Sequence, residues 1–376
     1  MPTPSRTLTI YPFLAVGVIV GGLFAFLISH FSIPIFSSIF PFRGKGISPP
    51  YISLLYYWIG FYGLLFLLAY PNAQSLTKLI TTTFACSFLA SFPFYWSHYD
   101  SSSQFFLMLF SAYALNAFHI HYHSNNFQLS YQTLFYAVWD TFVKLMIAFF
   151  FTLLCWLILL STATLFKLIN IFFFSRLIST GWSNAWLTAI LFNIGLYIPS
   201  KINSVVRNVR MVFLYICRYL FIPLAIIGIM FITAFFIMNN QHLNTNTSAL
   251  LFIPFLCVIF LNGVYQDGSI GNPYPTFLMW ICRLFLWVTP IFTVLALHNI
   301  YFSGYNNISE HGFNIHNFFY FLNTALLLIY NLTYFVIALG WQKQWLKPIE
   351  RCNIVLAIVI IVIAMITTQP WLLKLI

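Results

Sequence analysis

The chain has 376 residues, of which 61% are hydrophobic and only 6% are charged, and its mean hydropathy is +0.90. Soluble domains carry roughly 25% charged residues, so this chain has too few polar side chains to cover the surface of a soluble fold. Its formal charge of +11 comes from sixteen Lys and Arg against five Asp and Glu. The basic residues lie in short connections between apolar runs, where they fix orientation across a membrane and do not indicate nucleic-acid binding.

Eleven uninterrupted apolar runs are long enough to cross a bilayer, which takes about 20 helical residues. In hydrocarbon the backbone must satisfy its own hydrogen bonds, so runs of this length form helices and not the short alternating strands of a barrel. We therefore predict an all-α fold, a polytopic transmembrane helix bundle of about 11 helices, with a range of roughly 10 to 12. The runs cover residues 11–29, 51–70, 79–96, 104–120, 142–166, 185–200, 211–238, 249–264, 274–298, 317–339 and 354–369.

Between two of these runs, residues 167–184 predict an amphipathic segment on the membrane surface. Its aromatic side chains, Phe172, Phe173, Phe174 and Trp182, would anchor it at the level of the lipid headgroups. A re-entrant segment is the alternative interpretation.

The connections indicate the organisation and orientation of the chain. No linker of domain length occurs, so we predict that residues 1–376 form a single membrane domain. Residues 239–248 and 299–316 contain no Lys or Arg and are predicted to lie outside. The positive-inside rule places in the cytoplasm the connections that contain Lys201, Arg207, Arg210, Lys343, Lys347 and Arg351. The orientation of the N-terminal half stays open, because the same alternation leaves outside the basic residues Arg43, Lys45, Lys167 and Arg176.

Two stretches indicate a tandem repeat within residues 201–353. Ile216-Cys217-Arg218 and Ile281-Cys282-Arg283 each begin a predicted helix, and a proline follows each of them, at Pro223 and Pro290. Such internal similarity predicts a tandem pair of helical hairpins in parallel orientation, as in some transporter halves. Chance similarity between apolar sequences is the alternative.

Arg218 and Arg283 lie seven and nine residues inside their predicted helices, which corresponds to a depth of roughly 10 to 14 Å. An arginine near the middle of a bilayer costs at least ~2.5 kcal/mol and therefore faces the bundle interior, a partner or a water-filled cavity. Snorkelling of the side chain to the headgroups is the alternative. If both arginines face one cavity, an anionic solute or lipid would supply the counter-charge, because the chain has only five carboxylates.

The polar turn after the eighth apolar run could complete such a site. It reads Asn262-Gly263-Val264-Tyr265-Gln266-Asp267-Gly268. Glycine suits a helix C-cap, so an ordinary cytoplasmic turn explains most of these residues, although not Asp267. That carboxylate is predicted to lie on the same side of the membrane as both arginines. It could be a structural ion-pair partner or part of a functional site. The candidate ligand-binding residues are therefore Arg218, Arg283, Asp267, Asn262 and Tyr265.

A run of alternating histidines, His119, His121 and His123, ends the fourth apolar run. His119 and His123 share a helical face at i, i+4 spacing and are the candidate metal ligands. A metal site would need further ligands and nearby carboxylates, and the one acidic residue nearby in the sequence is Asp140. The alternative is that these histidines lie at the membrane interface and bind no metal. We predict no cofactor, because the sequence contains no phosphate-binding loop, nucleophile elbow or zinc-protease motif.

Two further spacings predict structural contacts. Gly17 and Gly21 form a Gly-x-x-x-Gly motif in the first run, which allows another helix backbone to approach closely. Asp140 and Lys144 stand at i, i+4 and predict an ion pair on the surface of one helix.

Three segments of the C-terminal part carry a resemblance. They are the turn at 261–268, the helix that contains Arg283, and residues 304–313. With them, residues 250–376 resemble an uncharacterised family of bacterial inner-membrane proteins, a domain of unknown function, and the N-terminal half resembles it more loosely. In the family, this loop has a Tyr-Gly-Leu-Thr segment that is followed by a basic residue. The chain departs from that pattern and has Glu-His-Gly-Phe-Asn at 310–314. The resemblance implies a multi-pass protein of the bacterial cytoplasmic membrane and implies no activity.

The leading hypothesis is a transporter-like protein that handles a small anionic solute or lipid at Arg218, Arg283 and Asp267 in the cytoplasmic half. Proton coupling is disfavoured, because such relays use Asp, Glu or His within the membrane and the long spans contain almost none. The alternative is a non-catalytic membrane scaffold or regulatory subunit. An intramembrane enzyme comes third, because only the histidine run offers a possible reactive set. The predicted partners are membrane lipids, anionic or carrying a linked substrate.

Overall fold

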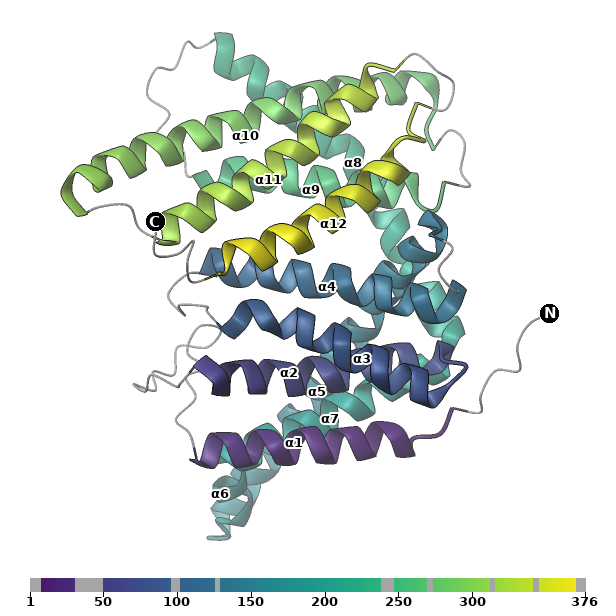
Figure 1. Cartoon of the computed structure of the whole chain (residues 1–376), viewed down its shortest axis with the longest axis vertical. Coiled ribbons are helices and arrows are strands. Elements are labelled where there is room, and N and C mark those ends of the chain that lie inside the picture. Colours follow the sequence, from purple (N-terminus) through teal and green to yellow (C-terminus); the bar gives the residue numbers. More distant parts are fainter. Residues whose placement is uncertain are drawn as a thin grey trace. The chain divides into compact units, whose positions relative to one another are not determined.

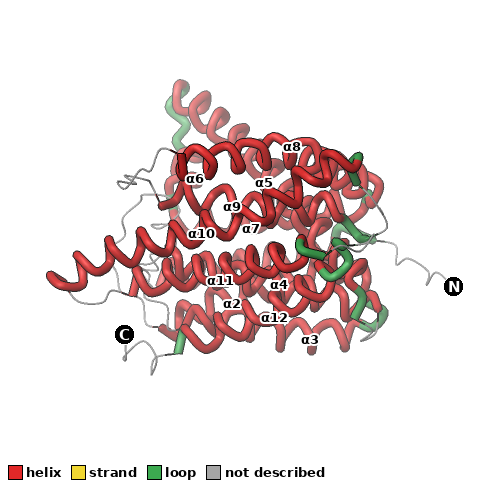
Figure 2. The backbone as a smooth tube through the Cα atoms, turned by 90° about the horizontal axis from the view of Figure 1, so that it is seen from above, coloured by secondary structure: helices red, strands yellow, loops and turns green. Residues whose placement is uncertain are grey.

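The computed structural model describes residues 8–30, 50–95, 102–125, 129–237, 247–268, 273–311, 315–340 and 345–369. Within these ranges the chain forms helices joined by turns and contains no strand (Figures 1 and 2). The described α-helices are α1 (Tyr11–His30), α2 (Pro50–Ala69), α3 (Leu76–Ser91), α4 (Ser102–Asn125), α5 (Tyr131–Leu168), α6 (Phe173–Ser179), α7 (Gly181–Lys201), α8 (Asn203–Ile237), α9 (Thr247–Tyr265), α10 (Thr276–His311), α11 (Ile315–Ala338) and α12 (Ile349–Thr367). Two short 3₁₀ helices, η1 (Tyr70–Asn72) and η2 (Phe92–Tyr95), follow α2 and α3.

Among the described helices, eight are long and apolar enough to cross a membrane, so the chain is a multi-pass membrane protein. They are α1, α2 with η1, α5, and α8 to α12. The other three predicted runs also form helices, α3, α4 and α7. α3 has 16 residues, or about 24 Å of helix against a hydrocarbon core of about 30 Å. α4 and α7 are long enough but richer in polar side chains.

Several helices extend beyond the apolar runs from which they were predicted. α5 begins at Tyr131, well before residue 142, and α6 forms a short helix inside the predicted surface segment. α10 continues to His311, so most of the connection predicted at 299–316 is helical. Hydropathy marks where apolar residues end, whereas a helix continues until capping residues stop it. Of the basic residues used for orientation, Arg43, Lys45 and Lys343 lie outside the described ranges.

The chain divides into two compact units. Unit 1 comprises residues 1–97 and 112–210, and unit 2 comprises residues 98–111 and 211–376. Both contain helices apolar enough to cross a membrane, so the division does not separate a membrane part from another kind of domain. The predicted tandem hairpins correspond to α8–α9 and α10–α11, and their common origin stays a prediction.

In unit 1, α1 packs lengthwise against α7 (Figure 1). A Cβ atom added to Gly17 would lie 3.1 Å from the Cα atom of Ile190, and one added to Gly21 would lie 2.9 Å from the carbonyl oxygen of Trp186. Backbones this close leave no room for a side chain, which is the use of this motif between membrane helices. The predicted packing role of the two glycines is therefore confirmed, and the partner is a helix of the same chain.

In unit 2, large aromatic side chains fill the space between α8 and α10. Phe221 meets Phe285 edge-on with ring centroids 5.8 Å apart, and Phe231 stacks on Phe292 at 5.4 Å. A further buried cluster joins the start of α4 to α11 and α12 through Leu107, Phe319, Leu326 and Ala364. Packing of this kind is the main source of helix association where lipid removes the hydrophobic driving force.

Candidate functional site

The polar turn after α9 is a left-handed helix end. Gln266 and Gly268 have φ values of 57° and 81°. The amide of Gln266 donates to the carbonyl of Asn262 at 2.9 Å, which satisfies a carbonyl of the last helical turn. A Cβ atom on Gly268 would lie 2.7 Å from Oε1 of Glu350, so both the backbone conformation and the neighbouring carboxylate require glycine there.

Two of the predicted ligand-binding residues have structural partners in unit 2. The hydroxyl of Tyr265 donates to Oε1 of Glu350 at 2.6 Å. Asn262 belongs to a closed ring of three hydrogen bonds with Tyr334 and Asn353. Its Nδ2 donates to the Tyr334 hydroxyl at 2.9 Å, and that hydroxyl donates to Oδ1 of Asn353 at 2.8 Å. Nδ2 of Asn353 donates to Oδ1 of Asn262 at 2.5 Å and closes the ring. Every member of the ring both donates and accepts, so the ring ties α9, α11 and α12 together.

Removing the Tyr334 hydroxyl should open this ring. In Tyr334→Phe, Nδ2 of Asn262 and Oδ1 of Asn353 each lose a partner in a partly buried place, so we expect a loss of about 0.5–2 kcal/mol in the free energy of unfolding. Denaturant titration in mixed micelles measures it. Tyr330→Phe on the same helix is the matched control, because the Tyr330 hydroxyl donates no hydrogen bond to a described residue. Equal losses in both variants would contradict the role of the ring.

Arg218 is occupied by the chain segment that leads into α10. Its guanidinium donates to the carbonyl oxygen of Pro273 and lies 5.5 Å from the ring of Tyr274. The Tyr274 hydroxyl donates back to the carbonyl of Arg218. Arg218 therefore fixes the start of α10, and neither snorkelling nor a shared arginine cavity is needed to explain it.

Arg283 has a different environment. Its guanidinium carbon lies 5.3 Å from the ring of Trp280 and 4.7 Å from the ring of Trp345. Trp280 precedes it on α10 and is 40% exposed, whereas Trp345, in the turn before α12, is 5% exposed. Among the residues that the structure describes, Arg283 has neither a hydrogen-bond acceptor nor a carboxylate partner. It is a cation held by two indole faces, and its N–H groups donate to no residue in the described ranges.

Asp267 lies in the turn between α9 and α10 and is partly exposed. The described ion pairs do not join it to Arg218 or Arg283. The structure therefore gives the two predicted arginines separate partners, and it gives Asn262 and Tyr265 partners of their own.

The three histidines of α4 are buried inside unit 1, at 2%, 4% and 5% exposure. Thr82 Oγ1 lies 2.8 Å from Nε2 of His123 and 3.3 Å from Nε2 of His119, and Thr133 Oγ1 lies 2.5 Å from Nδ1 of His121. His119 and His123 share a face, as predicted, with ring centroids 5.0 Å apart. Among the described residues, no three His, Cys, Asp or Glu side chains are placed to hold a metal ion. The histidines instead bind hydroxyls of α3 and α5.

His123 should make the stability of unit 1 depend on pH. His123 lies at the end of α4, beyond the predicted span 104–120. Burial lowers its pKa below the ordinary value of 6.5, and the charge of Lys78 on α3 lowers it further. The unfolded chain then binds more protons than the folded one, so stability is fully present above pH 6.5 and is lost as the pH falls below it. We expect a lower melting temperature at about pH 5 than at about pH 8, and a smaller difference in His123→Gln. An unchanged difference in that variant would contradict this origin.

Asp140 pairs with a cation other than the predicted one. The guanidinium of Arg210, at the start of α8, donates to Oδ1 of Asp140 and lies 4.4 Å from the ring of Tyr136. Lys144 forms no ion pair with any residue in the described ranges. The i, i+4 prediction was therefore wrong about the partner, because a residue from another helix occupies the carboxylate.

The sequence interpretation missed the residues that surround the candidates. Trp280 stands three positions before Arg283 and so shares its helical face, a spacing that is visible in the sequence. The other missed residues come from segments far along the chain and carry no local signal: Tyr334, Trp345, Glu350 and Asn353.

No family model, no curated protein and no solved structure matches this chain.

Proposed function

We propose that this membrane protein binds an anionic group, on a small solute or a lipid headgroup, at Arg283, and handles that ligand in a transporter-like way. The supporting observation is the guanidinium between Trp280 and Trp345, without an acceptor or a carboxylate among the described residues. Indole faces stabilise the cation but leave its N–H edges available. Those edges match the paired oxygens of a phosphate or carboxylate.

The location of Arg283 favours a ligand at the membrane surface. It stands seven residues after the first residue of α10, about 10 Å along the helix, and tryptophans are enriched at the level of the headgroups. The exposed Lys347 and Arg351 follow Trp345 in the same segment and add positive charge. Glu350 accepts a hydrogen bond from Tyr265. An anionic lipid or solute would supply the missing counter-charge.

The other predicted site residues take different roles in this proposal. Arg218, Asn262 and Tyr265 hold helices in place, and Asp267 stands in the turn after α9. A scaffold or regulatory subunit without catalysis is the second candidate function. The closed ring of Asn262, Tyr334 and Asn353 favours it, because such a ring serves the packing of helices.

The proposal includes the membrane context. We infer eleven spans, with α3, α4 and α7 added to the eight apolar helices, because every predicted run coincides with a helix. The family resemblance of residues 250–376 supports a bacterial cytoplasmic membrane as the location.

Native mass spectrometry of the gently solubilised protein tests the proposal. Wild type is compared with Arg283→Gln, with Arg218→Gln, and with Arg207→Gln, an exposed arginine of unit 1 that controls for loss of one charge. The probes are phosphatidylglycerol, phosphatidylcholine and inorganic phosphate. A charge-assisted hydrogen bond contributes about 1.5–3 kcal/mol, so Arg283→Gln should weaken binding of the anionic probe about tenfold or more.

The outcomes separate the candidate functions and the two sources of the anion. Loss of phosphatidylglycerol in Arg283→Gln alone supports a headgroup site, and competition by inorganic phosphate supports a free anion. Arg218→Gln should lower the melting temperature without changing the bound species. If wild type retains no anionic probe, or if Arg283→Gln binds as wild type does, the proposal is overturned and the scaffold remains.

A further inference from the structure

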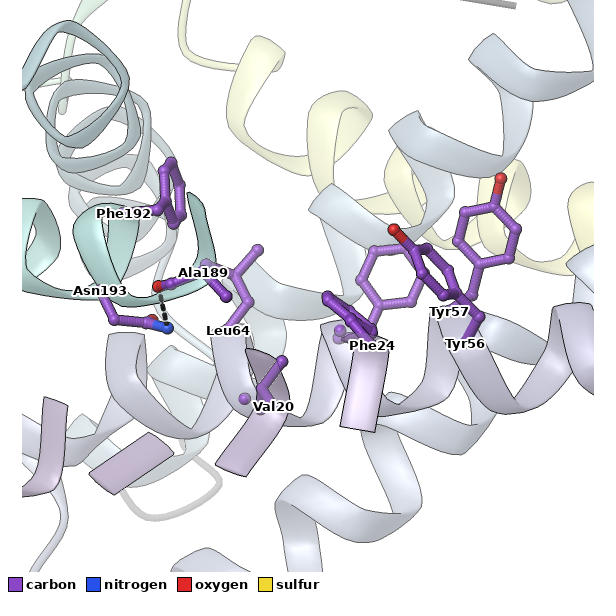
Figure 3. A pocket seen from close by; sticks show the side chains of 11 residues that line it. Val20, Phe24, Tyr56, Tyr57, Leu64, Ala189, Phe192 and Asn193 are labelled. Atoms are coloured by element: carbon purple, nitrogen blue, oxygen red, sulfur yellow. Dashed lines mark hydrogen bonds between the residues drawn. The ribbon is translucent and has the colours of Figure 1, made fainter. Parts of the chain in front are cut away.

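A cavity of about 250 Å³ lies in unit 1 between α1, α2 and α7. Its walls are formed mainly by Val20, Phe24, Tyr56, Leu64, Phe192 and Asn193. Figure 3 shows Phe24, Tyr56 and Tyr57 at one end, Phe192 and Asn193 at the other, and Val20 and Leu64 between them. The cavity is partly open.

Two glycines of α2 provide the room. Gly60 and Gly63 both line the cavity. A Cβ atom on Gly60 would lie 3.2 Å from Cζ of Phe24, and one on Gly63 would lie 2.8 Å from Cγ2 of Val20. Any larger residue at these positions would project toward the side chains that line the cavity. The space therefore depends on glycine at both positions.

Water is a poor occupant of this cavity. A buried water needs two to four polar partners, and the lining is apolar and aromatic apart from Asn193 and the two tyrosines. Nδ2 of Asn193 already donates to the carbonyl of Ala189 at 2.8 Å, along the dashed line of Figure 3. An empty apolar cavity, in turn, forfeits the dispersion contacts of its walls.

We propose that this cavity holds a segment of one acyl chain from a membrane lipid. On α1, the exposed apolar side chains Ile19 and Leu23 directly precede Val20 and Phe24, which line the cavity. The surface beside the opening is therefore lipid-facing, and acyl chains are the material at hand. Pockets for drug-sized ligands measure roughly 300–1,000 Å³, so this smaller apolar space suits part of an acyl chain better than a whole drug-sized molecule.

Photo-crosslinking in nanodiscs tests the proposal. The probe is a phosphatidylcholine with a diazirine in its acyl chain, and labelled residues are mapped by mass spectrometry. Gly60→Leu places a branched side chain against Phe24 and fills the space, so labelling of Phe24, Tyr56 and Phe192 should fall at least about fivefold. Gly22→Leu is the matched control, because a Cβ atom there meets nothing within 4 Å.

The wild-type map decides the proposal even if Gly60→Leu does not fold. Labels confined to exposed positions such as Ile19 and Leu23, with none on Phe24, Tyr56 or Phe192, would overturn it. Equal labelling of the cavity in folded Gly60→Leu and in wild type would do the same. A diazirine-bearing free fatty acid forms the second arm, and labelling of the cavity by this probe without labelling by the phospholipid would overturn the proposal in favour of a free fatty acid.

Discussion

Replacing Asp140 with asparagine is expected to lower the free energy of unfolding by about 2–4 kcal/mol. The Asp140 and Arg210 side chains are 32% and 12% exposed, so the pair is partly withdrawn from solvent. Asparagine keeps an amide oxygen that can accept from Arg210 but removes the negative charge, so the Arg210 cation loses its carboxylate partner and keeps the nearby ring of Tyr136. Breaking a fully buried pair costs about 3–5 kcal/mol, and the partial exposure of Asp140 places the expected loss somewhat below that range.

A double-mutant cycle measures the pair itself. Asp140→Asn, Arg210→Gln and the double variant are unfolded in mixed micelles, and the double variant should be more stable than the sum of the single losses predicts. A second cycle with Lys144→Gln tests the same-helix pairing and should show a smaller coupling energy. Additive losses for Asp140 and Arg210, or stronger coupling of Asp140 to Lys144, would contradict the pairing seen in the structure.

The helices were predictable because their signal is local. A long apolar run in a chain this poor in charge can satisfy its backbone only as a helix, and each such run overlaps a described helix over most of its length. The close contact made by Gly17 and Gly21 was predictable for a similar reason, since two small residues one turn apart leave a flat helix face. The shared face of His119 and His123 followed from helical spacing alone.

The partners were not predictable, because helical spacing relates only residues of the same helix. It connected Asp140 to Lys144, while the structure brings Arg210 from a segment about 70 residues away. The sequence identified Arg218 and Arg283 as charges that are costly within a membrane. It did not show that Arg218 donates to Pro273 and is structural, or that Arg283 lies against Trp345 and is a candidate binding residue, because both contacts come from other segments. The cavity beside Gly60 depends on how three helices meet, and one sequence does not contain that information.

Leucine at Gly21 should be the most damaging single change in unit 1. A Cβ atom at Gly21 would already lie 2.9 Å from both the carbonyl oxygen and Cδ1 of Trp186, and 3.1 Å from Cβ of Ala189. The backbone of α7 cannot yield as a side chain does, so the two helices must separate along their shared face. We expect a loss of about 3 kcal/mol or more, at or beyond the upper end of overpacking effects.

Gly22→Leu makes the same chemical change one residue away and provides the comparison. A Cβ atom on Gly22 meets nothing within 4 Å, and leucine is a better helix former than glycine by up to about 1 kcal/mol. This variant should unfold at the same denaturant concentration as wild type or a slightly higher one, whereas Gly21→Leu should unfold well below it. Because both variants add the same apolar atoms to α1, a difference between them can arise only from the contact with α7. Equal stability of the two variants would mean that α1 and α7 do not pack through Gly21.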